Sequence, residues 1–143
     1  METLSYSFYP IDARMYIIAE NGKAVIIDPC VSEEAKKYLQ SQNIEDIIVL
    51  LTHEHYDHIS GVNWLRGNFP KTRVVCSEAC SKAIMSPHKN LSAYYEILFM
   101  GKDPEVHEYV KNMEVPPYSC GADETFQGQT EWSWEGHQIS MVE

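Results

Sequence analysis

The segment that most constrains the fold is residues 47–51 (IIVLL), five consecutive apolar residues. Successive side chains of a β-strand point to opposite faces, so a strand that is apolar at every position needs cover on both faces. Strands of this kind lie in the middle of a sheet rather than at its edge. We therefore predict that residues 47–51 form the central strand of the fold.

The segments on either side predict a mixed sheet. Asn21-Gly22 is typical of a tight turn between two antiparallel strands, and Ser32, followed by Glu33 and Glu34, is a typical helix N-cap.

In residues 90–113, Tyr94, Tyr95, Leu98 and Phe99 have the spacing of one helix face, and Pro104 is suited to start a second helix. The further predicted strands are residues 4–9, 14–19, 23–28, 72–76 and 138–143, and the predicted helices are residues 32–40, 60–65, 77–85 and 90–113. An opening meander followed by alternating helices and strands indicates an α+β fold with helices on the sheet.

Four potential metal ligands follow the central strand within six positions, in residues 52–58 (THEHYDH). An extended backbone points residues i and i+2 to the same side, so His53 and His55 can present two nitrogens to one ion. Asp57 and His58 lie beyond the bend and can hold a second ion beside the first. Imidazoles and carboxylates are zinc ligands in catalytic sites, and α/β sheets place ligands at the carboxyl ends of strands. The sequence therefore predicts a metal site in this loop.

Such a site predicts hydrolytic chemistry. A bound divalent ion lowers the pKa of its water from ~15.7 toward ~7, which provides hydroxide at neutral pH, and two ions roughly 3.5–4 Å apart can share that hydroxide. Asp57 is the candidate catalytic residue, because its carboxylate can orient the hydroxide or carry its proton. We expect one or two zinc ions, although iron and manganese accept the same ligands.

The charge balance argues against nucleic acid as a partner. The chain has 11 basic and 21 acidic residues, a formal charge of -10, and no basic cluster, and an acidic surface repels phosphate backbones. No run reaches the roughly 18 apolar residues of a membrane span, and the first residues do not resemble a signal peptide. We therefore expect a cytoplasmic protein that acts on a small molecule and binds neither nucleic acid nor membrane.

The four cysteines are Cys30, Cys76, Cys80 and Cys120. Cys76 and Cys80 are four positions apart, as in part of a zinc knuckle, but no second pair follows at a suitable spacing. We expect all four to be small buried side chains in a reducing compartment.

The HxHxDH spacing of residues 52–58, followed by Gly61, resembles the signature of the metallo-β-lactamase superfamily. The preceding chain is similar to the N-terminal half of that family: a meander, residues 26–29 (IIDP), a helix, a buried strand and the histidine loop. Cys30 stands where the family usually has glycine. The resemblance implies an αββα sandwich with zinc at the edge between its two sheets. It also implies that this chain holds about the first half to two-thirds of the sandwich.

The resemblance also implies roles for individual residues. His53 and His55 match the ligands of the first ion, and Asp57 and His58 match those of the second. Asp28 matches the strand-end aspartate of the family, which supports the histidine loop from behind the ligands. A turn-forming role for Asp28 is equally compatible with the sequence.

The family's remaining ligands, a third histidine, a bridging aspartate and a final histidine, belong to segments that would follow Glu143. We therefore expect residues 1–143 to be a single metallo-β-lactamase-like domain truncated at its C-terminus. A catalytic zinc takes three protein ligands, whereas each ion here has two. His88, His107 and His137 are expected at exposed helix or turn positions and offer no replacement. The expectation is weak, substoichiometric zinc binding and little turnover.

Two functions remain open. The first is a metallo-hydrolase that attacks a small ester-like substrate, such as a thioester or lactone, with this chain inactive or impaired in isolation. The second is a non-catalytic metal-binding half-domain that persists as a homodimer. A half-sandwich would expose an apolar sheet face, and a twofold partner could cover it.

Overall fold

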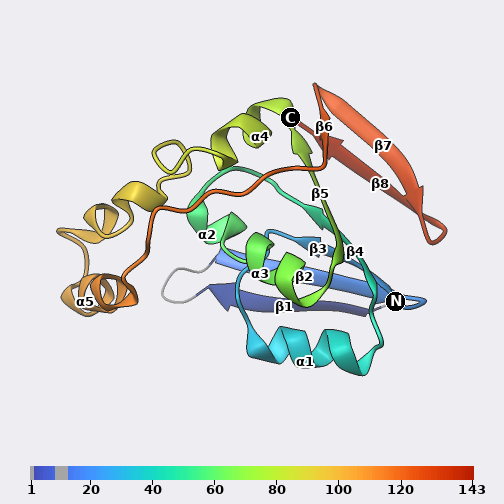
Figure 1. Cartoon of the computed structure of the whole chain (residues 1–143), viewed down its shortest axis with the longest axis horizontal. Helices are drawn as coiled ribbons and strands as arrows, with labels where there is room; N and C mark the ends of the chain where they lie inside the picture. The colour runs from blue at the N-terminus through green and yellow to red at the C-terminus, as the bar shows by residue number, and fades with distance from the viewer. Residues whose placement is uncertain (1, 9–12) are drawn as a thin grey trace.

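A computed structural model describes residues 2–8 and 13–143, and a six-stranded sheet forms its centre (Figure 1). The strands are β1 (Glu2–Phe8), β2 (Ala13–Glu20), β3 (Lys23–Ile27), β4 (Asp46–Leu50), β5 (Lys71–Ser77) and β6 (Glu124–Phe126). They lie side by side in sequence order. The pairs β1–β2 and β2–β3 are antiparallel, and the pairs from β3 to β6 are parallel. The predicted meander and mixed sheet are confirmed, except that residue 9 of the first predicted strand lies outside the described residues.

Helices connect the parallel strands (Figure 1). They are α1 (Glu33–Ser41), α2 (Tyr56–Ile59), α3 (Val62–Asn68), α4 (Glu78–Ile84) and α5 (Pro104–Met113), with the short 3₁₀ helices η1 (Ser92–Tyr94) and η2 (Ile97–Phe99). Of these, α1, α3 and α4 pack on one face of the sheet, whereas α5 lies to one side of it (Figure 1). The Ser32 hydroxyl accepts the Ala35 N–H at the start of α1, as predicted, and Ser77 caps α4 in the same way. Among the described residues, every helix is too short or too polar to cross a lipid bilayer.

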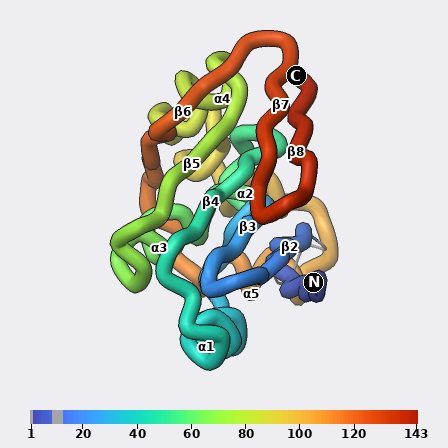
Figure 2. The backbone as a smooth tube through the Cα atoms, turned by 90° about the vertical axis from the view of Figure 1, so that its right-hand side faces the viewer, coloured from blue at the N-terminus to red at the C-terminus, as the bar shows by residue number. Residues whose placement is uncertain are grey.

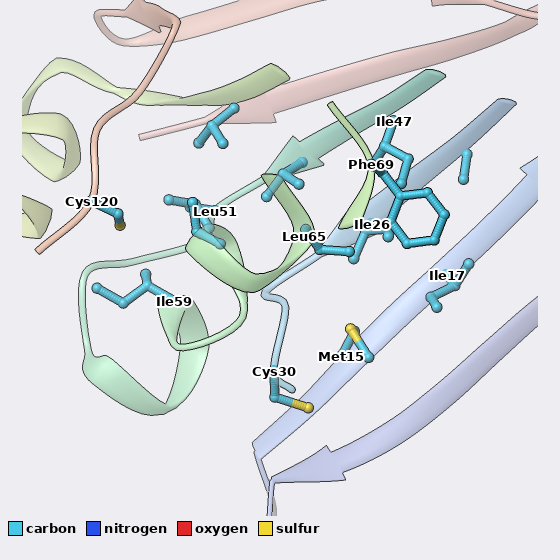
Figure 3. Packing of buried hydrophobic residues seen from close by; sticks show 14 of the residues in the cluster. Met15, Ile17, Ile26, Cys30, Ile47, Leu51, Ile59, Leu65, Phe69 and Cys120 are labelled. Carbon is cyan, nitrogen blue, oxygen red and sulfur yellow. The ribbon is translucent and has the colours of Figure 1, made fainter. Parts of the chain in front are cut away.

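β4 is covered on both faces, as its apolar run predicts. It pairs in parallel with β3 on one side and with β5 on the other. Ile47 and Val49 belong to the core on the helix side, whereas Leu50 belongs to a second core on the opposite side, and all three are buried. The larger core lies between sheet and helices, where Met15 and Ile26 from the sheet are in one cluster with Leu65 and Phe69 (Figure 3).

A β-hairpin packs on the other face of the sheet. It consists of β7 (Gln129–Trp134) and β8 (His137–Val142), and it lies in front of the sheet in Figure 2. Trp134 is buried against Val25, Leu50 and Val75, which come from β3, β4 and β5. The expectation that this sheet face stays bare is therefore wrong at its apolar centre. Because the hairpin covers that centre, the sheet face does not require a second copy of the chain to cover it.

Polar contacts hold the tip of the hairpin to the β2–β3 turn. Lys23 Nζ lies 2.8 Å from Glu135 Oε1, and Asn21 Nδ2 donates to Glu135 Oε2 at 3.1 Å. On the next strand, His137 Nε2 lies 2.6 Å from Glu20 Oε2. The hairpin thus makes both an apolar and a polar contact with the sheet.

Trp134→Ala is expected to detach this hairpin. The indole is 7% exposed and fills the second core, and loss of a buried tryptophan side chain lowers the free energy of unfolding by about 3–5 kcal/mol. Hydrogen exchange should show faster exchange in β7 and β8 and little change in β2. Glu131→Ala, an exposed position on the same strand, is the control and should leave exchange unchanged. Equal exchange in the two variants would contradict this packing.

The predicted helix over residues 90–113 forms only in its second part. α5 begins at Pro104 as predicted, but residues 92–99 form η1 and η2 with turns between them. Because a 3₁₀ helix has three residues per turn, the side chains predicted to share one face are separated. Tyr95 is 3% exposed, whereas Tyr94 and Leu98 are 41% and 42% exposed.

Candidate metal centre

The histidine loop leaves the sheet at the carboxyl end of β4, beside the end of β3. The Asp28 N–H donates to the Leu50 carbonyl at 3.0 Å, which continues the parallel ladder to the edge of the sheet. The chain then passes through Thr52 to His55, the N-cap of α2, and this short helix carries Asp57 and His58. The ends of neighbouring strands therefore bring Asp28 and the loop together.

The buried Asp28 carboxylate contacts both Thr52 and His58. Its Oδ1 accepts the Thr52 N–H at 2.8 Å, and its Oδ2 accepts the Thr52 hydroxyl at 2.6 Å. The same Oδ2 lies 2.9 Å from His58 Nδ1. Its φ of 51° is in the left-handed region, which aspartate tolerates better than most residues. Both predicted roles of Asp28, at the turn and behind the histidines, are compatible with this geometry.

These contacts determine which imidazole nitrogens carry protons. A carboxylate only accepts hydrogen bonds, so the Nδ1 of His58 that faces Asp28 must be protonated. The Thr52 hydroxyl has one proton, which it donates to Asp28, so at 2.9 Å it accepts from His53 Nδ1. In the neutral rings, the Nε2 atoms of His53 and His58 therefore keep their lone pairs. Hydrogen bonds of this kind orient histidines that bind metals.

The rings and the carboxylate converge instead of pointing apart. The His53 ring centroid lies 4.1 Å from that of His58 and 4.8 Å from that of His55. Asp57 Oδ2 lies 3.4 Å from His58 Nε2. The structure therefore places the four predicted ligands next to one another. Among the described residues, however, only His53 and His58 of these four belong to a group whose donor atoms all lie within 4.8 Å of one another.

The electrostatics of the cluster differ between His53 and His58. Burial lowers the pKa of His53, and the neighbouring His58 and His55 rings lower it further, which favours the neutral form that binds metals. The hydrogen bond to Asp28 raises the pKa of His58, and the negative charge of Asp57 also raises it. The carboxylates that favour a proton on His58 also favour a metal ion beside it.

The residues whose donor atoms lie closest together include Asp28, which is not one of the predicted ligands. Among the described residues, Asp28, His53 and His58 each have a donor atom within 4.8 Å of the other two. Both oxygens of Asp28 already accept hydrogen bonds from Thr52 or His58. We therefore interpret Asp28 as the residue that orients the histidines, with His53 and His58 facing an ion.

The other histidines of the described chain have different neighbours. His137 contacts Glu20, and the His88 ring packs edge-on against Tyr94 with centroids 5.3 Å apart. His107 Nε2 lies 3.6 Å from Glu96 Oε1, and this side chain is partly buried rather than exposed. The cysteines are all free thiols and buried, as predicted.

Two residues near the site have roles that the motif alone does not reveal. Thr52 links Asp28 to His53, although only its position directly before the first histidine hints at it. The Gly61 N–H donates to the Pro29 carbonyl at 2.9 Å. A Cβ atom at Gly61 would lie 2.7 Å from the Cys30 carbonyl carbon, so the absence of a side chain allows the two loops to approach.

Residues 9–140 match the family model of the metallo-beta-lactamase superfamily. The chain belongs to this superfamily. A hydroxyacylglutathione hydrolase from Prochlorococcus marinus (strain MIT 9211) is 30% identical over 110 residues, which cover 77% of this chain and 41% of that protein. Hydroxyacylglutathione hydrolase 1 from Vibrio vulnificus (strain YJ016) is 38% identical over 60 residues, which cover 42% of this chain and 24% of that protein.

The likeness to solved structures confirms the fold. The crystal structure of BLEG-1 B3 metallo-beta-lactamase superposes on this chain with a TM-score of 0.71 and 21% sequence identity. The superposition covers 97% of this chain and 59% of the BLEG-1 chain. At this level of identity the likeness concerns the fold alone. The chain spans less than half the length of these curated relatives: 41% of the Prochlorococcus marinus protein and 24% of the Vibrio vulnificus protein.

Proposed function

We propose that this chain is part of a metal-dependent hydrolase that cleaves a thioester. The observation that carries the proposal is the close approach of His53 to His55 and His58, and of Asp57 to His58, at the edge of the sheet. The relatives named hydroxyacylglutathione hydrolase favour a thioester of glutathione over a lactone. Hydrolysis adds water across the thioester bond and yields a carboxylic acid and a thiol.

The residues of the cluster have distinct parts in this mechanism. His53 and His55 would hold one ion, and Asp57 and His58 a second, with zinc as the first choice. A bound ion supplies a water of lowered pKa and polarises the carbonyl of the substrate. Asp57 orients the attacking water and accepts its proton, while Asp28 and Thr52 hold the imidazoles in the required tautomer.

The number of ligands suggests that this chain binds the metal weakly by itself. A catalytic zinc takes three protein ligands and an open position. Each proposed ion has two ligands from the described residues, and His88, His107 and His137 have other neighbours. We therefore propose substoichiometric zinc and slow turnover for residues 1–143 measured alone.

Zinc binding tests the proposal directly. Competition with a chromophoric chelator should reveal zinc binding that His53→Ala or His58→Ala reduces by at least about tenfold. His88→Ala, an exposed histidine outside the cluster, is the matched control and should bind zinc like the unmodified chain. With excess zinc, slow hydrolysis of a hydroxyacylglutathione thioester should be abolished by Asp57→Asn. Zinc binding that neither cluster variant changes would refute the proposed centre.

A further inference from the structure

Tyr95 carries a hydroxyl that the fold does not use. The residue is 3% exposed, and its Oη is buried without a hydrogen-bond partner in the part of the chain that the structure describes. Its ring lies among Phe8, Tyr56 and Phe99, with centroid distances of 6.2, 5.1 and 5.3 Å. A phenylalanine would make the same ring contacts without burying an unpaired polar group, which destabilises a fold.

Tyr118, which also packs on Tyr56, has a hydroxyl with hydrogen-bond partners, as buried hydroxyls usually do. Its hydroxyl donates to the Ile59 carbonyl at 3.0 Å and accepts the Asn63 N–H at 3.2 Å. These bonds tie Tyr118 to α2 and α3, so its hydroxyl has a structural role. No comparable role exists for the hydroxyl of Tyr95. Residues that break a folding rule in this way are concentrated at functional sites.

The position of Tyr95 relates it to the metal centre. Its ring packs on Tyr56, the first residue of α2, and Asp57 is the next residue of that helix. Burial raises the pKa of the Tyr95 phenol, and the negative charge of Asp57 raises it further. Asp57 Oδ2 is directed at His58.

We propose that Tyr95 is a positioning residue whose hydroxyl donates a hydrogen bond to the Asp57 carboxylate when an ion is bound. A carboxylate that holds an ion through one oxygen can accept a hydrogen bond at the other, and such bonds fix the orientation of the ligand. The phenol is a buried donor that has no other hydrogen-bond partner in residues 2–8 and 13–143. Because no hydrogen bond joins the two side chains in the structure, the bond requires a shift of the Asp57 side chain. This inference rests on the proposed function.

Tyr95→Phe tests the proposal through two opposite effects. Without added metal, the variant should have a higher melting temperature than the unmodified chain, because an unpaired buried hydroxyl is removed. Its zinc affinity, measured by chelator competition, should be lower by about tenfold. A gain in stability cannot by itself lower affinity, since stabilising the folded chain favours binding. The combination therefore separates a role toward the metal from a role in the fold.

Two controls match this variant. Ser60→Ala removes another buried hydroxyl without a partner, on the residue that follows α2, and should raise the melting temperature without changing zinc affinity. Tyr118→Phe removes a bonded hydroxyl and should lower the melting temperature. Unchanged zinc affinity in Tyr95→Phe would overturn the inference, as would a lower melting temperature. If the unmodified chain bound no zinc at the histidine cluster, the proposed function itself would fail.

Discussion

Gly61→Ala is expected to lower the free energy of unfolding by about 3 kcal/mol or more. The added Cβ would lie 2.7–2.8 Å from the backbone N, C and O atoms of Cys30, and backbone cannot move aside as a flexible side chain can. The clash would also separate the loop that carries Asp28 from the loop that carries His58. Denaturant unfolding should therefore show a lower midpoint, and zinc affinity should fall in the same variant.

Gly67→Ala is the matched control for this prediction. Gly67 lies inside α3, and apart from its chain neighbours and the backbone of its own helix no atom of the described chain comes within 4 Å of the position where its Cβ would be. Alanine favours a helix over glycine by up to about 1 kcal/mol, so this variant should be slightly more stable than the unmodified chain. Equal stability of the two alanine variants would show that the approach to Cys30 is not close.

The sequence predicts the parts of this fold that depend on local pattern. The unbroken run of β4 predicts a strand with both faces covered, and Asn21-Gly22, with φ values of 53° and 76°, predicts the turn between β2 and β3. It does not predict β6, whose three residues are too few to show a period and which is held by its pairing with β5. The docking of Trp134 on β3, β4 and β5 depends on contacts between distant segments, so the cover of that face is also missed.

In the site, too, the features that depend on local pattern can be predicted and those that depend on distant contacts cannot. The spacing of residues 53–58 is sufficient to predict that these side chains lie close together, because they share one strand end and one short helix. The tautomers of His53 and His58 depend on Asp28, which lies 24 residues before Thr52 and 30 before His58. Hydrogen bonds across that separation exist only after the sheet has formed. The resemblance to a family assigns Asp28 its place, but only the geometry provides the physical reason.

Asp28→Asn is expected to weaken zinc binding by about 100-fold although no predicted ligand is changed. The Oδ1 atom accepts a backbone N–H from Thr52, so the amide oxygen of asparagine should remain there. The amide NH₂ then takes the place of Oδ2 and faces His58 Nδ1 as a donor. His58 must accept at Nδ1 and carry its proton on Nε2, the nitrogen that would bind the metal. Chelator competition measures the loss.

Asp123→Asn separates this effect from a general loss of stability. Asp123 Oδ2 also accepts a backbone N–H, from Val74 at 2.8 Å, and a side-chain bond from Arg66 at 2.7 Å. Its substitution should lower the melting temperature and leave zinc affinity unchanged, because neither partner belongs to the histidine cluster. Since asparagine tolerates the positive φ of position 28, backbone strain does not explain a loss there. Normal zinc affinity in Asp28→Asn would mean that His58 does not bind through Nε2, and the tautomer argument would then be wrong.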